Sequence, residues 1–180
     1  MSDDDRRRVA MDAAAYDERW GRLGAAGHDV HGEAALVHRL LGGRRRVLDA
    51  GCGTGRVAIR LAELGCDAVG IGVGPPLLLR PRAKAPSLTW CEADLARLGP
   101  LETPGPFDAI VMAGNVLIFV APGTERAVVS NLAQRLAPGG MLVAGFQLVP
   151  GRVTADGYDD HAASAGLIPV APFSTSPRCS

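Results

Sequence analysis

The chain has few aromatic residues, and this limits the kind of core that it can build. Phe, Trp and Tyr make up only 4% of its 180 residues, whereas 47% of the residues are hydrophobic. Ala, Val and Leu must therefore fill most of the interior. A chain of this length can bury roughly two-thirds of its unfolded surface in one domain. The composition predicts a single domain with an aliphatic core.

The sequence also lacks an excess of charge of either sign. Its 19 Lys and Arg residues balance its 19 Asp and Glu residues, and no segment concentrates the basic ones. Binding to nucleic acids or acidic membranes depends on such a basic excess. We therefore expect neither partner, and we expect a small-molecule substrate instead.

Long apolar runs and patterned cysteines are missing as well. No run approaches the ~18 apolar residues of a membrane span, and the charged first eight residues do not resemble a signal peptide. The four cysteines, at positions 52, 66, 91 and 179, show neither C-x-x-C spacing nor the density of a disulfide framework. The expectation is a cytoplasmic protein with reduced thiols and no metal site.

Short apolar runs alternate with helical patterns from residue 46 onward. This alternation predicts an α/β fold, a doubly wound and mostly parallel sheet with crossover helices. The expected strands are 47–50, 68–71, 88–91, 107–112 and 141–146. The expected helices are 11–26 and 30–41 ahead of the sheet, then 56–64, 77–84, 124–136 and 154–165. We divide the chain into an N-terminal arm with a leading helix (1–26), the main domain (27–171) and an unstructured, proline-broken tail (172–180).

The strongest local signal is a glycine-rich loop that follows the first expected strand. The segment Val-Leu-Asp-Ala-Gly-Cys-Gly-Thr-Gly-Arg spans residues 47–56. Glycines at alternate positions permit positive φ and let a ligand approach bare backbone, and the helix after them offers free N–H groups. A tight strand-to-helix turn without a ligand is the alternative. A dinucleotide fingerprint would need a third glycine where Arg56 stands, so the pattern disfavours NAD.

This loop resembles the first motif of class I, Rossmann-like S-adenosylmethionine-dependent methyltransferases. The resemblance covers about residues 27–170. It implies that Gly51, Gly53 and Gly55 pass under the methionine part of S-adenosylmethionine and that Cys52 is a further cofactor-binding residue of this loop. It also implies that Asp49 holds the amino group of the cofactor, directly or through water.

The segment His31-Gly32-Glu33-Ala34 resembles a stretch found ahead of this motif in one bacterial subgroup, where leading helices cover the cofactor. If the acceptor needs a catalytic base, the resemblance makes His31 the first candidate and Glu33 the second. Both residues could equally cap the second leading helix.

Two later segments resemble family loops at the same sheet edge. In Glu92-Ala93-Asp94-Leu95, the resemblance implies that Asp94 accepts a hydrogen bond from the adenine amino group and that the Leu95 backbone meets the ring. Asn115 and Val116 correspond to the loop that faces the transferred methyl group. Asp94 could instead be a helix cap, and Asn115 could be only a turn residue.

The sequence departs from the family pattern at two places. The second strand of the family ends in an acid that binds both ribose hydroxyls, and here Gly72 stands at that position. The C-terminal β-hairpin of the family is also expected to be missing or truncated. An open sheet edge would follow, which favours a monomer or a weak homodimer.

Three functions are compatible with these features. The first is S-adenosylmethionine-dependent methyl transfer to a small-molecule acceptor. The second is a non-catalytic methyltransferase-like binding protein whose cofactor site is weakened by Gly72. The third is an NAD-binding oxidoreductase.

Overall fold

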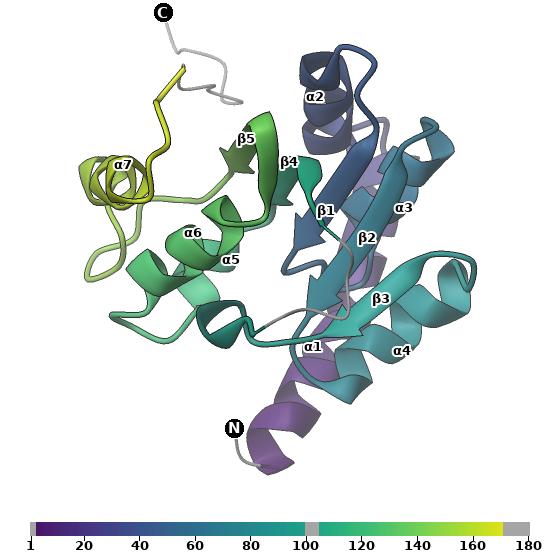
Figure 1. The fold of residues 1–180 in the computed structure, drawn as a ribbon. Helices are drawn as coiled ribbons and strands as arrows, with labels where there is room; N and C mark the ends of the chain where they lie inside the picture. The colour runs from purple at the N-terminus through teal and green to yellow at the C-terminus, as the bar shows by residue number, and fades with distance from the viewer. Residues whose placement is uncertain (1–2, 100–104, 171–180) are drawn as a thin grey trace, which may run out of the picture.

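The structure is a computed structural model that describes residues 3–99 and 105–170, so the tail expected at 172–180 lies outside the described residues. Its centre is a five-stranded sheet with the order β3-β2-β1-β4-β5, in which neighbouring strands are parallel (Figure 1). The strands are β1 Arg46–Ala50, β2 Asp67–Gly72, β3 Thr89–Glu92, β4 Phe107–Met112 and β5 Leu136–Ala144. The predicted doubly wound parallel sheet is confirmed, and its first strand lies in the middle.

Helices cover both faces of this sheet (Figure 1). Helices α2 (Gly32–Leu41), α3 (Arg56–Glu63) and α4 (Pro75–Lys84) pack on one face, and α1 (Asp3–Ala25) contacts α4. The other face carries the 3-10 turn η1 (Leu95–Arg97) with α5 (Val116–Phe119), α6 (Glu125–Ala133) and α7 (Ala155–Ser164).

The strands supply side chains to both layers because successive residues of a strand point to opposite faces. In β1, Val47 belongs to the core under α2 and α3, while Leu48 belongs to the core under α6. Both residues are fully buried. This explains why the sequence shows continuous apolar runs rather than alternation, as expected for parallel strands covered on two sides.

The boundaries around the last strand differ from the expectation. Helix α6 ends at Ala133 instead of residue 136, and β5 begins at Leu136 instead of residue 141. Leu136 already pairs with Phe107, and an irregularity of register follows before Ala109 pairs with Met141. The Pro-Gly-Gly segment at 138–140 therefore lies inside an irregular strand, where Gly139 has a φ of 70°.

Helix α4 contains a proline in its interior. The helix spans Pro75–Lys84 with Pro81 inside it, although an internal proline costs roughly 3 kcal/mol. The proline ring contacts the glycine loop: its Cβ would lie 2.7 Å from a Cβ placed on Gly55. The short elements η1 and α5 were not expected from the sequence.

Strand β5 is the outer strand on its side of the sheet. Within residues 3–99 and 105–170, no strand follows it in the chain. The predicted association through this edge stays a prediction. None of the helices in the described part of the chain is both long and apolar enough to cross a membrane.

The contact between Gly70 and Trp90 gives a test of the packing between β2 and β3. A Cβ at Gly70 would lie 2.4 Å from two atoms of the Trp90 ring, so Gly70→Ala should lower the free energy of unfolding by about 1–3 kcal/mol. Gly21→Ala is the matched control, because Gly21 lies in α1 with nothing within 4 Å of its Cβ position. It should raise stability by about 0.5–1 kcal/mol. Urea unfolding measures both, and an equally stable Gly70→Ala protein would contradict this packing.

Candidate functional site

The glycine loop joins β1 to α3 at the carboxyl edge of the sheet. The backbone N–H groups of Gly51 and Cys52 both donate to the Ile71 carbonyl oxygen, each over 2.8 Å. Gly51, Gly53 and Gly55 all have positive φ, at 87°, 52° and 85°. The chain needs glycine at these positions because other residues adopt such angles only with strain.

The atoms beside each glycine show whether the protein itself fills the space there or leaves it open to a ligand. A Cβ at Gly51 would lie 2.5 Å from a Val116 methyl carbon, and one at Gly55 would lie 2.9 Å from the Trp90 ring. Gly53 has nothing within 4 Å of its Cβ position. The protein itself therefore occupies the space at two of the glycines, and Gly53 is the one that offers bare backbone to open space.

Asp49 lies buried beneath this loop. Only 3% of its surface is exposed, and its Oδ2 accepts a hydrogen bond of 3.0 Å from the Ala58 N–H. Burial raises the pKa of Asp49 from 3.8 to about 7, against the opposing effects of the Ala58 hydrogen bond and the positive charge of Arg56. A carboxylate held in this way would be stabilised by a cationic group, such as an ammonium, placed beside it.

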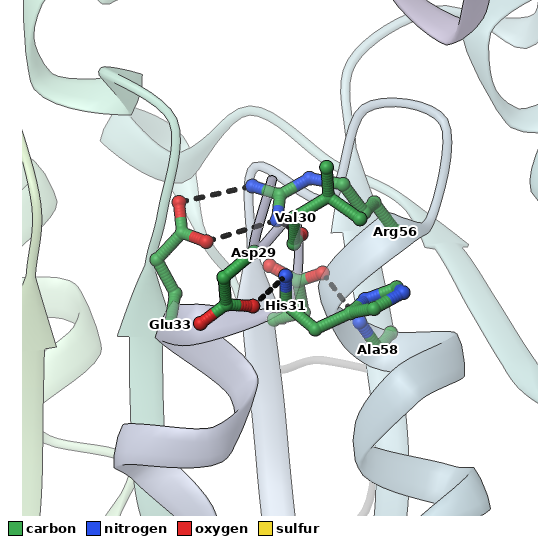
Figure 2. Close-up of polar contacts among 7 residues, drawn as sticks. Asp29, Val30, His31, Glu33, Arg56 and Ala58 are labelled. Atoms are coloured by element: carbon green, nitrogen blue, oxygen red, sulfur yellow. Dashed lines mark hydrogen bonds and ion pairs between the residues drawn. The ribbon is translucent and has the colours of Figure 1, made fainter. Parts of the chain in front are cut away.

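A cluster that we call the Arg56 clasp ties the leading helices to the start of α3. Figure 2 shows the Arg56 guanidinium donating to both carboxylate oxygens of Glu33, over 2.9 and 3.0 Å. Arg56 also donates to the Val30 carbonyl oxygen, and its guanidinium carbon lies 4.1 Å from the centre of the Trp20 ring. The clasp thus consists of Trp20, Val30, Glu33 and Arg56. It holds α1 and the start of α2 beside the glycine loop.

Of the two residues expected as catalytic bases, Glu33 belongs to the clasp and His31 lies next to it in the chain. Burial acts to raise the pKa of Glu33, but the hydrogen bonds and charge of Arg56 outweigh it, and the pKa lies below its ordinary value. These contacts favour a structural role for Glu33 over that of a base. His31 stands at the N-cap of α2 without a capping side-chain bond, and its N–H donates to Asp29 Oδ1. Its role as a base stays a prediction.

A second set of ion pairs fixes α1 on α4. Asp17 accepts from Lys84 over 2.7 Å and from Arg80 over 3.3 Å. Lys84 also donates to the Thr54 carbonyl oxygen over 3.2 Å, which connects the pair to the glycine loop. Burial acts to raise the pKa of Asp17, but its hydrogen bonds to Lys84 and Arg80 and the positive charge of Lys84 lower it overall. Helix α1 is therefore a fixed cover over one side of the loop.

Gly72 ends β2 next to this loop. Its φ lies outside the left-handed region, and a Cβ there would lie 3.3 Å from Leu78 Cδ2 and 3.5 Å from Cys52 Sγ. The backbone would therefore accept an acid at this position with a small shift of Leu78. Cys52 is buried, and burial followed by the charge of Asp49 raises the pKa of its thiol. This disfavours Cys52 as a nucleophile.

The remaining predicted residues follow β3 and β4 at the same edge. Asp94 Oδ1 accepts from the Ala96 N–H over 2.9 Å and caps η1, while Leu95 is buried. Asn115 has a φ of 72°, and its Oδ1 accepts from the Gln147 N–H over 2.7 Å. Val116 packs on Gly51. Asp94 thus acts as a helix cap, and Asn115 acts as a turn residue. The roles of both residues in cofactor binding stay predictions.

Two aromatic residues of α1 that lie near the site were not predicted from the sequence. Tyr16 and Trp20 stand one turn apart in α1, with ring centres 5.9 Å apart. The Tyr16 hydroxyl lies 3.3 Å from the Cβ position of Gly114, in the loop after β4. The sequence does place two of its few aromatic residues, Tyr16 and Trp20, at the i, i+4 spacing that puts them on one face of a helix. The sequence could not show which element they would cover.

The comparison with protein families agrees with this geometry. Residues 47–140 match the family model described as a methyltransferase domain. A solved TehB-like SAM-dependent methyltransferase from Corynebacterium glutamicum is 31% identical, with a TM-score of 0.76 over 86% of this chain and 83% of that one. SAM-bound CalS10, an amino pentose methyltransferase from Micromonospora echinaspora, is 28% identical, with a TM-score of 0.62 over 78% of this chain and 58% of that one.

Curated relatives are longer than this chain. Magnesium-protoporphyrin O-methyltransferase of Rhodobacter capsulatus is 32% identical over half of this chain, and the match covers 40% of that protein. A methyltransferase of Synechocystis is 28% identical over 68% of this chain and 57% of its own length. The chain thus spans about half the length of the curated relatives that it matches. From its glycine loop, its sheet order and these matches, the chain belongs to the class I S-adenosylmethionine-dependent methyltransferase family.

Proposed function

We propose that this chain binds S-adenosylmethionine at the carboxyl edge of its sheet and transfers the methyl group to a small-molecule acceptor. The observation that carries the proposal is the open backbone at Gly53, which lies between the buried carboxyl of Asp49 and the Arg56 clasp. A turn glycine such as Gly65 also has open space beside it, and what distinguishes Gly53 is the buried carboxyl of Asp49 beneath the same loop.

The residues of the chain suit positioning rather than chemical activation. When bound, the cofactor supplies a methyl group on a sulfonium sulfur, which an acceptor removes by in-line displacement. The protein then needs to hold donor and acceptor in line and to exclude water. Asp49 would hold the amino group, Gly53 would admit the methionine backbone, and α1 with the clasp would cover the site.

The class of acceptor rests on relatives. CalS10 is named as an amino pentose methyltransferase, and a relative from Streptoalloteichus that is 26% identical is named as a sugar N-methyltransferase. The absence of a basic excess in this chain agrees with a small, uncharged or weakly charged acceptor. His31 remains the candidate base for such an acceptor.

A second function, cofactor binding without useful catalysis, is favoured by one observation. The strand end that should carry the ribose-binding acid carries Gly72, and the N-cap of the following helix α4 is Gly74, which offers no capping side chain. An NAD-binding role is less well supported, because Arg56 fills the third glycine position and is engaged with Glu33.

A calorimetric titration separates the three functions. We expect S-adenosylmethionine and S-adenosylhomocysteine to bind and NAD not to bind. Binding without turnover on any amino sugar or other small acceptor would favour the non-catalytic function. Binding of NAD alone would contradict the proposal.

The pKa of Asp49 predicts how affinity depends on pH. The free protein holds a proton on Asp49 below about pH 7, and an ammonium ligand favours the ionised carboxylate. S-adenosylhomocysteine should therefore bind about tenfold more tightly at pH 8 than at pH 6. Asp49→Asn should bind weakly at both pH values and lose this dependence, as measured by calorimetry. A pH dependence retained in Asp49→Asn would show that another group titrates.

The variant Gly72→Asp tests whether the missing carboxylate at position 72 weakens binding of the cofactor's ribose. Hydrogen bonds to a charged acceptor contribute about 1.5–3 kcal/mol, and displaced water offsets part of that. We expect the affinity for S-adenosylhomocysteine to rise about tenfold. An analogue without the two ribose hydroxyls should gain nothing, because it cannot meet the new carboxylate. Equal gains for both ligands would mean that Asp at this position acts through the loop.

A further inference from the structure

The carboxyl ends of β2 and β3 lie side by side, and an acid stands on the second of them. Glu92 is the last residue of β3 and is the register partner of Gly72. The Ala93 N–H donates to the Gly72 carbonyl oxygen over 3.0 Å, so the pairing continues past both residues. Neighbouring strands are spaced by roughly 4.8 Å. Glu92 is therefore the closest neighbour of Gly72 across the sheet on that side.

The two positions also share a face of the sheet. Trp90 packs against Gly70, its register partner, on the face covered by α3 and α4. Two residues further along each strand, Gly72 and Glu92 return to the same face, because strand side chains alternate. A side chain at Gly72 and the side chain of Glu92 would thus leave the sheet in the same direction.

Other acids of this edge have partners, and Glu92 has none among the described residues. Glu33 pairs with Arg56, Asp49 accepts from Ala58, and Asp94 caps η1. Glu92 is exposed, and in residues 3–99 and 105–170 its carboxylate has no hydrogen bond or ion pair. Its two oxygens are therefore free to accept hydrogen bonds from a ligand.

We propose that Glu92 supplies, from β3, the carboxylate for the ribose hydroxyls that Gly72 cannot supply from β2. This inference rests on the proposed binding of S-adenosylmethionine. The side chain of Glu is one methylene longer than that of Asp, which offsets part of the roughly 4.8 Å between the two strands. Glu92 is then a specificity residue for the ribose and takes no part in the methyl transfer itself.

Calorimetry with S-adenosylhomocysteine and its 2′,3′-dideoxy analogue tests the assignment. Glu92→Ala should weaken binding of S-adenosylhomocysteine about tenfold and leave binding of the dideoxy analogue unchanged. Asp160→Ala is the matched control, because Asp160 is an exposed acid on α7, on the other face of the sheet (Figure 1). It should change neither affinity, and thermal unfolding should show all variants to be folded.

A double variant makes the test more specific. If Glu92 and an acid at position 72 serve the same hydroxyls, Gly72→Asp should raise the affinity of the Glu92→Ala variant about a hundredfold, past that of the unaltered protein. Its gain should be larger in that background than in the unaltered protein, where two adjacent carboxylates would repel each other. Equal gains in both backgrounds would show that the two positions act independently and would overturn the assignment.

The outcomes separate this inference from the proposed function. Unchanged binding of S-adenosylhomocysteine by Glu92→Ala, or an equal loss for the dideoxy analogue, overturns the role of Glu92 alone. Absence of any S-adenosylhomocysteine binding by the unaltered protein overturns the proposed function, and the role of Glu92 falls with it.

Discussion

The site depends on one buried hydrogen bond, from the Ala58 N–H to Asp49 Oδ2. It joins the end of β1 to the first turn of α3, and the glycine loop between them must close over a short distance. The Ile71 carbonyl oxygen holds the start of the loop, and Trp90 with Pro81 confines its end at Gly55. The loop is therefore held from β1, β2, β3 and α4 at once, so its backbone is preorganised for a ligand.

The same packing explains why the sequence predicted the position of the glycine loop but not the contacts of its individual glycines. Alternating apolar and helical segments predict parallel strands joined by crossover helices, but they leave the order of the strands open. Which glycines serve packing could not be predicted from the sequence, because Val116 contacts Gly51 and Trp90 contacts Gly55 from distant parts of the chain. The early start of β5 was not predicted, because the pairing of Leu136 with Phe107 joins segments that lie far apart in the chain.

Long-range pairing also decides the roles of charged residues. Glu33 looks like a free acid in sequence, yet Arg56, 23 positions later, binds it with two hydrogen bonds. Glu92 looks like an ordinary surface residue, yet the register of β2 and β3 places it beside Gly72. Neither relation has a local pattern. Both follow only once the sheet order and register are known.

The balance of charge at the carboxyl edge favours one class of ligand over another. Arg56 is engaged with Glu33, and Lys84 with Asp17, so the nearby cations are already neutralised. Asp49 is buried with a pKa of about 7, and Glu92 and Asp94 add exposed carboxyl groups. A dinucleotide would bring its pyrophosphate charge against these acids, while Arg56 and Lys84 are already engaged with other carboxylates. A sulfonium ligand with an ammonium group brings positive charge, which would stabilise the ionised carboxylate of the buried Asp49. Electrostatics therefore agrees with the glycine spacing in favouring S-adenosylmethionine over NAD.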